Sequence, residues 1–284
     1  MKLEAHDLVL AHGSHVAVDG ASLQVSPGEL LAVVGPNGSG KSTLLRGLAR
    51  VHPWRSGTVT LDGRAMSSMG SREVARSLAI LPQSPEAGLD LTVRELAWRG
   101  RYPHQGILQR AMPRDYQAVD RALQAADVAD IAERVLGSLS GGERQRAWIA
   151  LALAQEPRVL LLDEPTTSLD LRHQLDVMRL LRRLSAEGMA IIVVLHDLAL
   201  VGRNADRVLA ISEGRIVFDG PPRVVFTREA LERVFDVPMM ILIDPVSGLP
   251  IPLTAAAVDA SPTTSSADST PGRSALSLPS TPTG

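Results

Sequence analysis

A glycine-rich run with a lysine near its end occupies residues 35–43. It reads Gly35, Pro36, Asn37, Gly38, Ser39, Gly40, Lys41, Ser42 and Thr43. This order fits the pattern G-x-x-x-x-G-K-[ST], in which backbone N–H groups curl around a phosphate at a helix N-terminus. We expect Lys41 to bring a positive charge to the β- and γ-phosphates of a nucleotide and the Ser42 hydroxyl to ligate Mg²⁺. The alternative is a chance glycine-rich turn.

Two adjacent acids end the apolar run 159–162. Buried carboxylates are costly unless a cation or a donor faces them, so Asp163 and Glu164 predict a charged ligand at this strand end. We expect Asp163 to hold Mg²⁺ through a water and Glu164 to polarise the water that attacks a γ-phosphate. The alternative is a surface turn that begins Asp-Glu-Pro.

Three single residues are weaker candidates. Gln83 ends a predicted strand at 79–83, where its amide oxygen can coordinate Mg²⁺ or orient water. His196 follows a predicted core strand at 190–195, at the sheet edge where open α/β folds bind ligands, and can donate a hydrogen bond to a γ-phosphate. His12 precedes the phosphate loop and is either a platform for a nucleotide base or a solvated turn residue.

A second possible anion site begins the predicted helical run 145–154. Ser140, Gly141 and Gly142 offer a hydroxyl and free amides ahead of that helix. The alternative is a simple helix cap, because Ser140 and Glu143 also have the spacing of a capping box.

The surrounding pattern predicts the elements that position these residues. Strands are expected at 3–10, 16–25, 30–34, 57–62, 159–164, 190–195, 207–211 and 215–218, and helices at 41–50, 71–78, 92–99, 115–136 and 227–235. The apolar stripe Leu171, Leu175, Met178, Leu181 and Leu184 predicts one more helix with these five leucine and methionine side chains in the core. Residues from Thr254 onward are rich in Ser, Thr, Pro and Ala, and we expect them to be disordered.

Composition limits the class of protein. The 284 residues are 45% hydrophobic, enough for a large core, and carry a formal charge of −2, which does not suggest a nucleic-acid binder. The absence of cysteine excludes disulfides and cysteine-ligated zinc. No apolar stretch approaches the roughly 18 residues of a membrane span, so we expect a cytoplasmic chain or one held at a membrane by a partner.

Taken together and in order, these motifs resemble the ATP-binding subunits of ABC transporters over residues 1–253. The resemblance implies an α/β P-loop NTPase core with a parallel sheet, an N-terminal antiparallel β-subdomain and an inserted helical subdomain at about 84–140, followed by a tail at 254–284. It implies ATP and Mg²⁺ as ligands. It also implies a head-to-tail homodimer, in which the Ser140-Gly141-Gly142 segment of one copy closes on the ATP bound to the phosphate loop of the other.

The amino-acid sequences of four short segments narrow the resemblance to importer ATPases for ferric siderophores, with haem and vitamin B12 importers as relatives. The similar segments are 81–83, 100–105, 144–150 and 173–174. Such subunits lie on the cytoplasmic face of the membrane, join integral membrane permeases and work indirectly with a substrate-binding protein. The resemblance makes Pro85, Glu86, Leu89, Arg99 and Tyr102 candidate permease contacts. One departure is His12, where the family usually has an aromatic residue such as tyrosine.

Two other classes share these motifs. ABC-type ATPases of translation carry two such modules, and those of DNA repair carry a long coiled coil; this chain has neither feature. A nucleotide-sensing regulatory subunit is the third possibility, and the presence of both Glu164 and His196 argues against an inactive enzyme.

Overall fold

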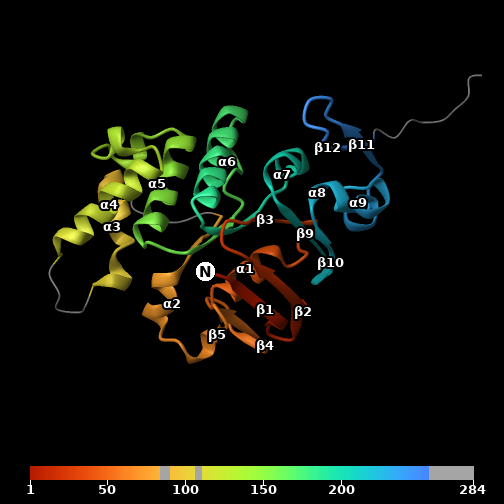
Figure 1. Ribbon diagram of the computed structural model, residues 1–284, viewed down its shortest axis with the longest axis horizontal. Helices are drawn as coiled ribbons and strands as arrows, with labels where there is room; N and C mark the ends of the chain where they lie inside the picture. The colour runs from red at the N-terminus through yellow and green to blue at the C-terminus, as the bar shows by residue number, and fades with distance from the viewer. Residues whose placement is uncertain (84–89, 106–110, 256–284) are drawn as a thin grey trace, which may run out of the picture.

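A six-stranded sheet forms the centre of the molecule, in the order β10-β9-β3-β8-β7-β6 (Figure 1). The structure is a computed structural model that describes residues 1–83, 90–105 and 111–255. The strands are β3 (Leu30–Val34), β6 (Leu78–Leu81), β7 (Val159–Asp163), β8 (Ala190–Val194), β9 (Arg207–Ser212) and β10 (Arg215–Gly220). All neighbouring pairs are parallel except β9 and β10. Parallel order brings the carboxyl ends of β3, β7 and β8 to one edge of the sheet.

A second, antiparallel sheet covers one side of the core, in the order β2-β1-β4-β5. Its strands are β1 (Leu3–His12), β2 (His15–Val25), β4 (Trp54–Leu61) and β5 (Arg64–Ala65). Polar and apolar residues alternate along β1 and β2, so each strand has one buried and one solvated side. This sheet packs next to the helix that follows the phosphate loop, α1 (Lys41–Leu48).

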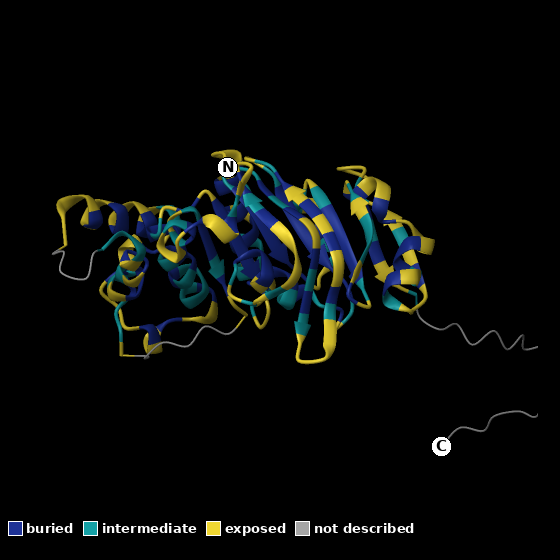
Figure 2. Ribbon diagram, turned by 90° about the horizontal axis from the view of Figure 1, so that it is seen from below, coloured by how far each residue is buried: buried dark blue, intermediate teal, exposed yellow. Residues whose placement is uncertain are grey.

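Alternate residues of the central strands serve two hydrophobic cores. Leu31 and Val33 of β3 pack with α1 and the antiparallel sheet, whereas Ala32 and Val34 pack with the helices on the opposite face. Figure 2 shows the resulting band of buried strands through the middle of the molecule. Because both faces are covered, β3, β7 and β8 are apolar at nearly every position.

Helices form the layer on the other face. They are α3 (Val93–Arg99), α4 (Pro113–Ala125), α5 (Gly141–Ala154), α6 (Leu171–Ala186) and α7 (Leu198–Asn204), whereas α2 (Ser71–Ser77) buries Val74 in the core on the side of α1. α5 packs against both α3 and α4, so the helical layer continues past residue 140 through α5 (Figure 1). Short one-turn helices at Tyr102–His104, Ala129–Ile131 and Leu136–Ser138 connect the longer ones.

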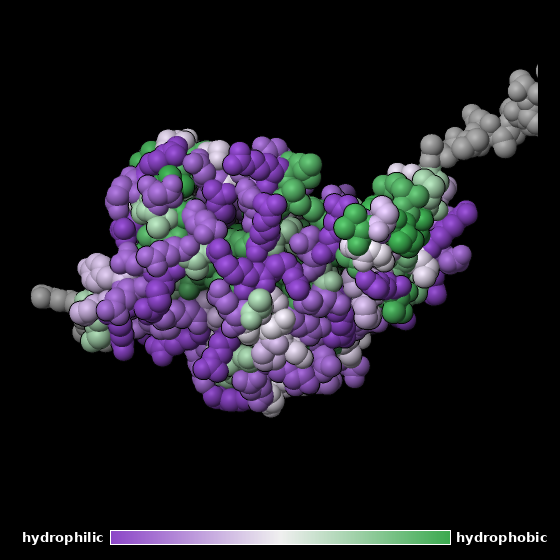
Figure 3. All heavy atoms as spheres, turned by 45° about the horizontal axis from the view of Figure 1, so that its top comes forward, coloured by the Kyte–Doolittle hydropathy of each residue, from purple (hydrophilic) through white to green (hydrophobic). Residues whose placement is uncertain are grey.

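The described chain ends in two helices and a hairpin. These are α8 (Pro222–Val225), α9 (Arg228–Phe235), β11 (Met239–Ile243) and β12 (Pro250–Thr254). The hairpin packs on α7 and α9, and Met240 and Leu253, which pair across it, are 45% and 39% exposed. Figure 3 shows apolar side chains gathered at this end of the molecule.

The predicted combination of a parallel core sheet, an N-terminal antiparallel sheet and a helical insertion is confirmed. The long helix predicted at 115–136 is wrong in its second half. α4 ends at Ala125 because Asp127 takes a left-handed backbone conformation and the chain turns so that Val128 enters the core. The core position predicted for Leu171 is also wrong: it is the first residue of α6 and is 67% exposed.

Two further boundaries differ from prediction. The strand expected at 79–83 ends at Leu81, so Gln83 lies in the loop beyond it. Thr254 belongs to β12 rather than to a tail, while residues 256–284 of the expected disordered segment lie outside the described residues.

An ion-pair network ties the helical layer together. Arg101, whose side chain is 2% exposed, donates to Asp115 at 3.0 and 3.1 Å, to Glu156 at 2.8 Å and to the Ala154 carbonyl at 2.7 Å. It therefore links the start of α4 to the residues that follow α5. Arg121 also bonds Glu156 but is 60% exposed.

We expect Arg101→Met to destabilise the fold by about 3–5 kcal/mol, because the change leaves the Asp115 carboxylate buried without its partner. Arg121→Met is the matched control, expected to cost about 0–1 kcal/mol because exposed ion pairs contribute little. Urea unfolding of both variants measures the difference. Equal small effects would show that the buried network does not hold the helical layer.

Candidate functional site

The phosphate loop joins the end of β3 to the start of α1, and its shape depends on glycine. A side-chain carbon at Gly35 would lie 2.1 Å from the Ile211 carbonyl oxygen, and one at Gly40 would lie 2.3 Å from the Ala17 carbonyl oxygen. Gly40 also has a φ of +102°, a conformation that other residues rarely adopt. The close approach of β9 and β2 therefore fixes the loop that the sequence pattern predicts.

An unpartnered hydroxyl inside the loop fits a phosphate ligand. The Ser39 side-chain oxygen is buried and has no hydrogen-bond partner among the described residues. A buried polar group left in this state costs about 1–3 kcal/mol, and an oxygen of a bound phosphate would accept its hydrogen bond. Together with the glycine cradle, this hydroxyl makes the loop suited to a phosphate group.

Lys41 is held by the loop itself. Its Nζ donates to the carbonyl oxygens of Gly35 at 2.9 Å and Pro36 at 2.8 Å. Burial lowers the pKa of the Lys41 ammonium group, while the negative charges of Glu164 and Asp163 act in the opposite direction. The site thus holds a buried cation close to the two acids at the end of β7.

A cavity of about 280 Å³ opens over the loop. Its lining consists of His12, His15, Ala17, Asn37, Gly38, Gly40, Lys41, Ser42, Thr43 and Glu164. His12, at the end of β1, lies 3.3 Å from the Thr43 hydroxyl through its Nε2 atom, and its ring stacks at a tilt of 51° on His52 with 4.5 Å between centroids. The structure therefore places His12 beside the phosphate loop, in a two-ring group rather than as an isolated turn residue.

Oxygen groups suited to a magnesium ion meet between α1 and β7. The Ser42 hydroxyl donates to Asp163 Oδ1 at 2.9 Å. Burial raises the pKa of the Asp163 carboxyl; the Ser42 hydrogen bond lowers it, the charge of Glu164 raises it, and the charges of Arg46 and Lys41 lower it. A hydroxyl and a carboxylate are the oxygen ligands that Mg²⁺ prefers, so this pair fits the ion.

We expect Asp163→Asn to raise the melting temperature of the nucleotide-free protein and to lower magnesium-dependent ATP turnover by about a hundredfold or more. A carboxylate with a raised folded pKa costs stability above its ordinary pKa of about 3.9, and this cost disappears as the pH falls below that value. The thermal gain should therefore be present at pH 7 and absent at acid pH. Thermal unfolding at both pH values, combined with ATPase assays, measures these effects. A lower melting temperature at pH 7 would contradict this description of Asp163.

Glu164 is the centre of a second cluster, at the ends of β7 and β8. Gln83 Nε2 donates to its Oε2 at 2.5 Å, the Thr167 hydroxyl donates to the same oxygen at 3.0 Å, and His196 Nε2 bonds Oε1. The backbone of Glu164 has a φ of +52°, and its amide donates to the Val194 carbonyl at 3.2 Å. This conformation and its three partners fix a side chain that is 11% exposed at the rim of the cavity.

The predicted site residues fall into two groups. The structure brings the phosphate loop, His12, Asp163, Glu164, Gln83 and His196 together. Gln83 and His196 both contact Glu164, and neither contacts Ser42 among the hydrogen bonds of the described residues. Ser140, Gly141 and Gly142 are not among the residues that line the described cavity.

The Ser140 segment forms the helix cap that was the alternative prediction. The Ser140 hydroxyl oxygen accepts the Glu143 amide at 3.2 Å, and Glu143 Oε2 accepts the Ser140 amide at 2.8 Å. A side-chain carbon at Gly142 would overlap the His173 ring at 2.0 Å, so α5 needs glycine here to pack on α6. The cap leaves the Ser140 hydroxyl proton free to reach an acceptor outside the chain.

Sequence reasoning missed four residues of this site. Thr167 lies in the loop after Glu164, and only its three-residue spacing from that acid hinted at contact. His15 and Ala17 enter the cavity because β1 and β2 turn back above the phosphate loop, and His52 follows α1. No local pattern marks these residues, since long-range packing positions them.

The sequence of this chain is similar to a known protein family and to several named proteins. A family model described as ABC transporter matches residues 18–167. The chain is 43% identical over 251 residues to the ferric enterobactin transport ATP-binding protein of Escherichia coli, covering 88% of this chain and 93% of that protein. It is 45% identical over 250 residues to a siderophore transport system ATP-binding protein of Bacillus subtilis, covering 88% and 91%. It is 45% identical over 236 residues to the hemin import ATP-binding protein of Streptomyces coelicolor, covering 83% and 84%.

Solved structures agree in fold. One is an inward-facing transporter described as an ABC transporter of the metal-chelate type, with a TM-score of 0.79, 28% identity, and coverage of 89% of this chain and 97% of that chain. Another is a subunit of a Clostridium perfringens ABC transporter complex, with a TM-score of 0.70, 30% identity, and coverage of 81% and 92%. The part of the chain that the structure describes contains no helix with enough apolar residues to span a membrane.

Proposed function

Because this chain belongs to the ABC transporter family as an ATP-binding subunit, we propose that it hydrolyses ATP to power an importer of ferric siderophores. The observation that supports this most strongly is that Glu164, which Gln83 holds, lines the same cavity as the phosphate loop. The cargo assignment rests on the relatives named for ferric enterobactin, petrobactin and iron hydroxamates. Haem is the second candidate because two similar proteins are named for hemin import.

The proposed chemistry assigns each group one task. The backbone N–H groups of the phosphate loop after Pro36 and the Lys41 ammonium group bind the β- and γ-phosphates, which requires Lys41 to exchange its bonds to the loop carbonyls for phosphate oxygens. Glu164 accepts a hydrogen bond from a water and takes its proton as the water oxygen bonds to the γ-phosphorus and the bond to the β-γ bridging oxygen breaks. The products are ADP and inorganic phosphate.

His196 and Gln83 orient the base in this proposal. Both bond the Glu164 carboxylate. Once a nucleotide is bound, His196 is also positioned to donate to the γ-phosphate. The ring of His12, supported by His52, is the proposed platform for the nucleotide base.

A magnesium ion would be held by Ser42 and, through a water, by Asp163, with the Gln83 amide oxygen as the third predicted group. When bound, the ion supplies positive charge that neutralises the phosphate oxygens. The chain's own contribution is the hydrogen-bonded pair of Ser42 and Asp163.

We propose that two copies complete the site. Among the described residues, Ser140 and the first residues of α5 do not line the cavity over the phosphate loop of their own chain. A second copy arranged head to tail would present its ATP to them, and the helix N-terminus would favour the γ-phosphate charge. ATP would then hold the two copies together, and hydrolysis would separate them.

The membrane partner is proposed to be an integral permease on whose cytoplasmic face the chain sits, with a substrate-binding protein acting at the far side. Tyr102 is 62% exposed on a turn held by two bonds: Arg76 Nε donates to the Pro103 carbonyl at 2.8 Å, and His104 Nε2 bonds the Gln155 carbonyl at 2.8 Å. With the exposed Arg99, this fixed turn remains the candidate contact. Pro85, Glu86 and Leu89 lie outside the described residues.

We propose that the ATPase domain predicted at 1–253 extends through Thr254, the last residue of β12, and that the chain beyond it has no part in ATP hydrolysis. The aligned segments that relate the chain to the siderophore proteins span 250 or 251 residues, which supports this division.

Two measurements test the proposed function. Affinity purification of the tagged chain from membranes should recover a polytopic permease, whereas recovery of ribosomes or DNA-repair proteins would favour the non-transport classes. Deletion of the gene should abolish uptake of radioactive iron supplied as a ferric siderophore and spare uptake of haem and vitamin B12. Loss of haem or vitamin B12 uptake alone would move the cargo assignment to that relative.

A further inference from the structure

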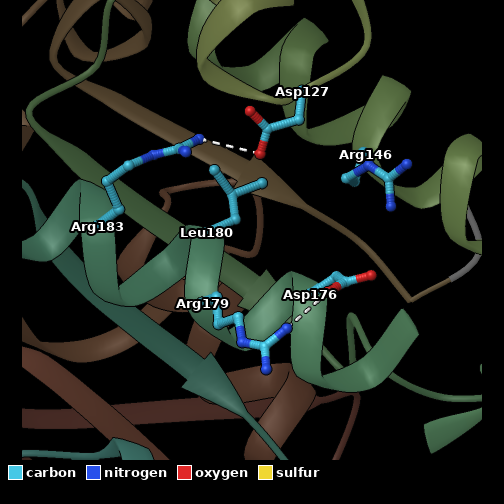
Figure 4. Close-up of a pocket in the computed structure, with 6 residues that line it drawn as sticks. All are labelled: Asp127, Arg146, Asp176, Arg179, Leu180 and Arg183. Carbon is cyan, nitrogen blue, oxygen red and sulfur yellow. Dashed lines mark hydrogen bonds and ion pairs between the residues drawn. The ribbon is translucent and has the colours of Figure 1, made fainter. Parts of the chain in front are cut away.

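A second cavity, of about 370 Å³, lies away from the phosphate loop. It is formed where the turn after α4 and helix α5 face α6, and Asp127, Arg146, Asp176, Arg179, Leu180 and Arg183 line it (Figure 4). None of these residues contributes to the nucleotide cavity. Five of the six carry charge, and the cavity is open to solvent, because the side chains of Asp127, Arg179 and Arg183 are 60%, 75% and 45% exposed.

The two acids of this cavity are already paired. Arg183 Nη2 donates to Asp127 Oδ2 at 3.3 Å and to the Ala125 carbonyl, and Arg179 Nη1 donates to Asp176 Oδ1 at 3.1 Å. Figure 4 shows these two pairs joined on either side of Leu180. Each arginine uses only part of its five N–H donors in these bonds. Pairing therefore neutralises both acids and leaves N–H groups on Arg179 and Arg183 available.

Arg146 has no such partner. It projects from α5, and its Nε atom is buried and makes no hydrogen bond within the described part of the chain. No ion pair of Arg146 with an acid occurs there either, although Asp127 and Asp176 share its cavity (Figure 4). A buried guanidinium donor without an acceptor is costly, and three arginines against two acids leave the cavity with an excess of one positive charge.

We propose that this cavity is a binding site for a tetrahedral oxyanion, with inorganic phosphate as the simplest ligand. The planar fork of Arg146 matches two phosphate oxygens, and its Nε–H gains the acceptor that it lacks. The remaining N–H groups of Arg179 and Arg183 then meet the other oxygens from α6. The bound anion joins α5 of the helical layer to α6 on the central sheet, so occupancy stabilises the packing of these two helices.

Phosphate titration with a thermal readout tests this site. The full-length protein is saturated with a non-hydrolysable ATP analogue, which occupies the phosphate loop, and is melted in increasing inorganic phosphate against potassium chloride at equal ionic strength. The wild-type melting temperature should rise with phosphate and saturate, as it does for a ligand that binds only the folded state. Arg146→Gln should weaken the apparent phosphate affinity by about tenfold or more. The matched control is Arg72→Gln, which removes one exposed charge from α2 and should change the affinity by less than about twofold.

Two further variants keep the test decisive. Arg146→Lys retains the charge without the planar fork and should bind phosphate between the wild type and Arg146→Gln. Should Arg146→Gln fail to melt cooperatively, Arg179→Gln takes its place, because that side chain is 75% exposed and its loss leaves the core intact. An Arg146→Gln protein with the phosphate response of the wild type would overturn the proposal. A wild-type protein that responds to phosphate no more than to chloride would overturn it equally.

Discussion

Replacing Glu164 with glutamine should lower ATP turnover by about two to four orders of magnitude while ATP binding persists. Glutamine keeps the size of the side chain and can still bond Thr167 and His196, but its amide cannot take a proton from the attacking water. Because binding remains and cleavage stops, the variant should accumulate an ATP-bound dimer. A phosphate-release assay gives the rate, and light scattering in ATP gives the mass.

Glu187→Gln is the control for this change. Glu187 is an exposed acid at the end of α6, and its replacement should leave turnover within about twofold of the wild type. Rapid hydrolysis by Glu164→Gln would remove Glu164 from the role of base. That result would leave the phosphate loop assignment intact, since the loop binds ATP through other groups.

Lys41→Ala should weaken ATP binding by about a hundredfold or more, because the phosphates lose a buried positive charge that no neighbouring residue replaces. The fold should survive, since the ammonium group is buried at a cost and bonds only two loop carbonyls. Fluorescence titration with an ATP analogue measures the affinity. ATP affinity equal to that of the wild type would show that residues 35–43 do not hold the phosphates.

The sequence offers a direct probe of the same contact. Lys2 and Lys41 are the only lysines in the chain, so amine labelling can mark only these two side chains and the N-terminal amine, and mass spectrometry separates the Lys41 peptide from the other two sites. ATP should protect Lys41 from labelling and leave Lys2 unchanged, and Lys2→Ala should bind ATP as the wild type does.

The core strands and the phosphate loop were predictable because both follow from local chemistry. β3 is apolar at every position because both faces of the sheet are covered. Gly40 is required because the chain turns there at a positive φ, close against the backbone of β2. Asp163 and Glu164 stood out because a buried strand rarely ends in two acids. Such patterns are visible in a few consecutive residues, and the fold class follows from their order.

Other features depended on contacts that local patterns do not contain. The helix predicted through 136 stops at Ala125 because Val128 is needed in the core, which overrides the helical spacing of the sequence. Leu171 fits an apolar stripe, but it is the first residue of α6 and lies before the part of the helix that packs on the core. The ring contact of His12 with His52 joins residues forty positions apart. The unpartnered Arg146 is visible only once α5 and α6 face one another.

The most direct test of the central claim is a cross-link between the phosphate loop of one copy and the Ser140 segment of another. The natural chain contains no cysteine, so Asn37→Cys chains mixed with Ser140→Cys chains, each also carrying Glu164→Gln, can join at these positions only between molecules. With ATP and Mg²⁺ under mild oxidation, we predict a disulfide-linked dimer whose digest contains the peptide pair joining positions 37 and 140, and far less of it without nucleotide. Absence of that pair in a mixture that binds ATP would contradict a site completed by two copies of the chain.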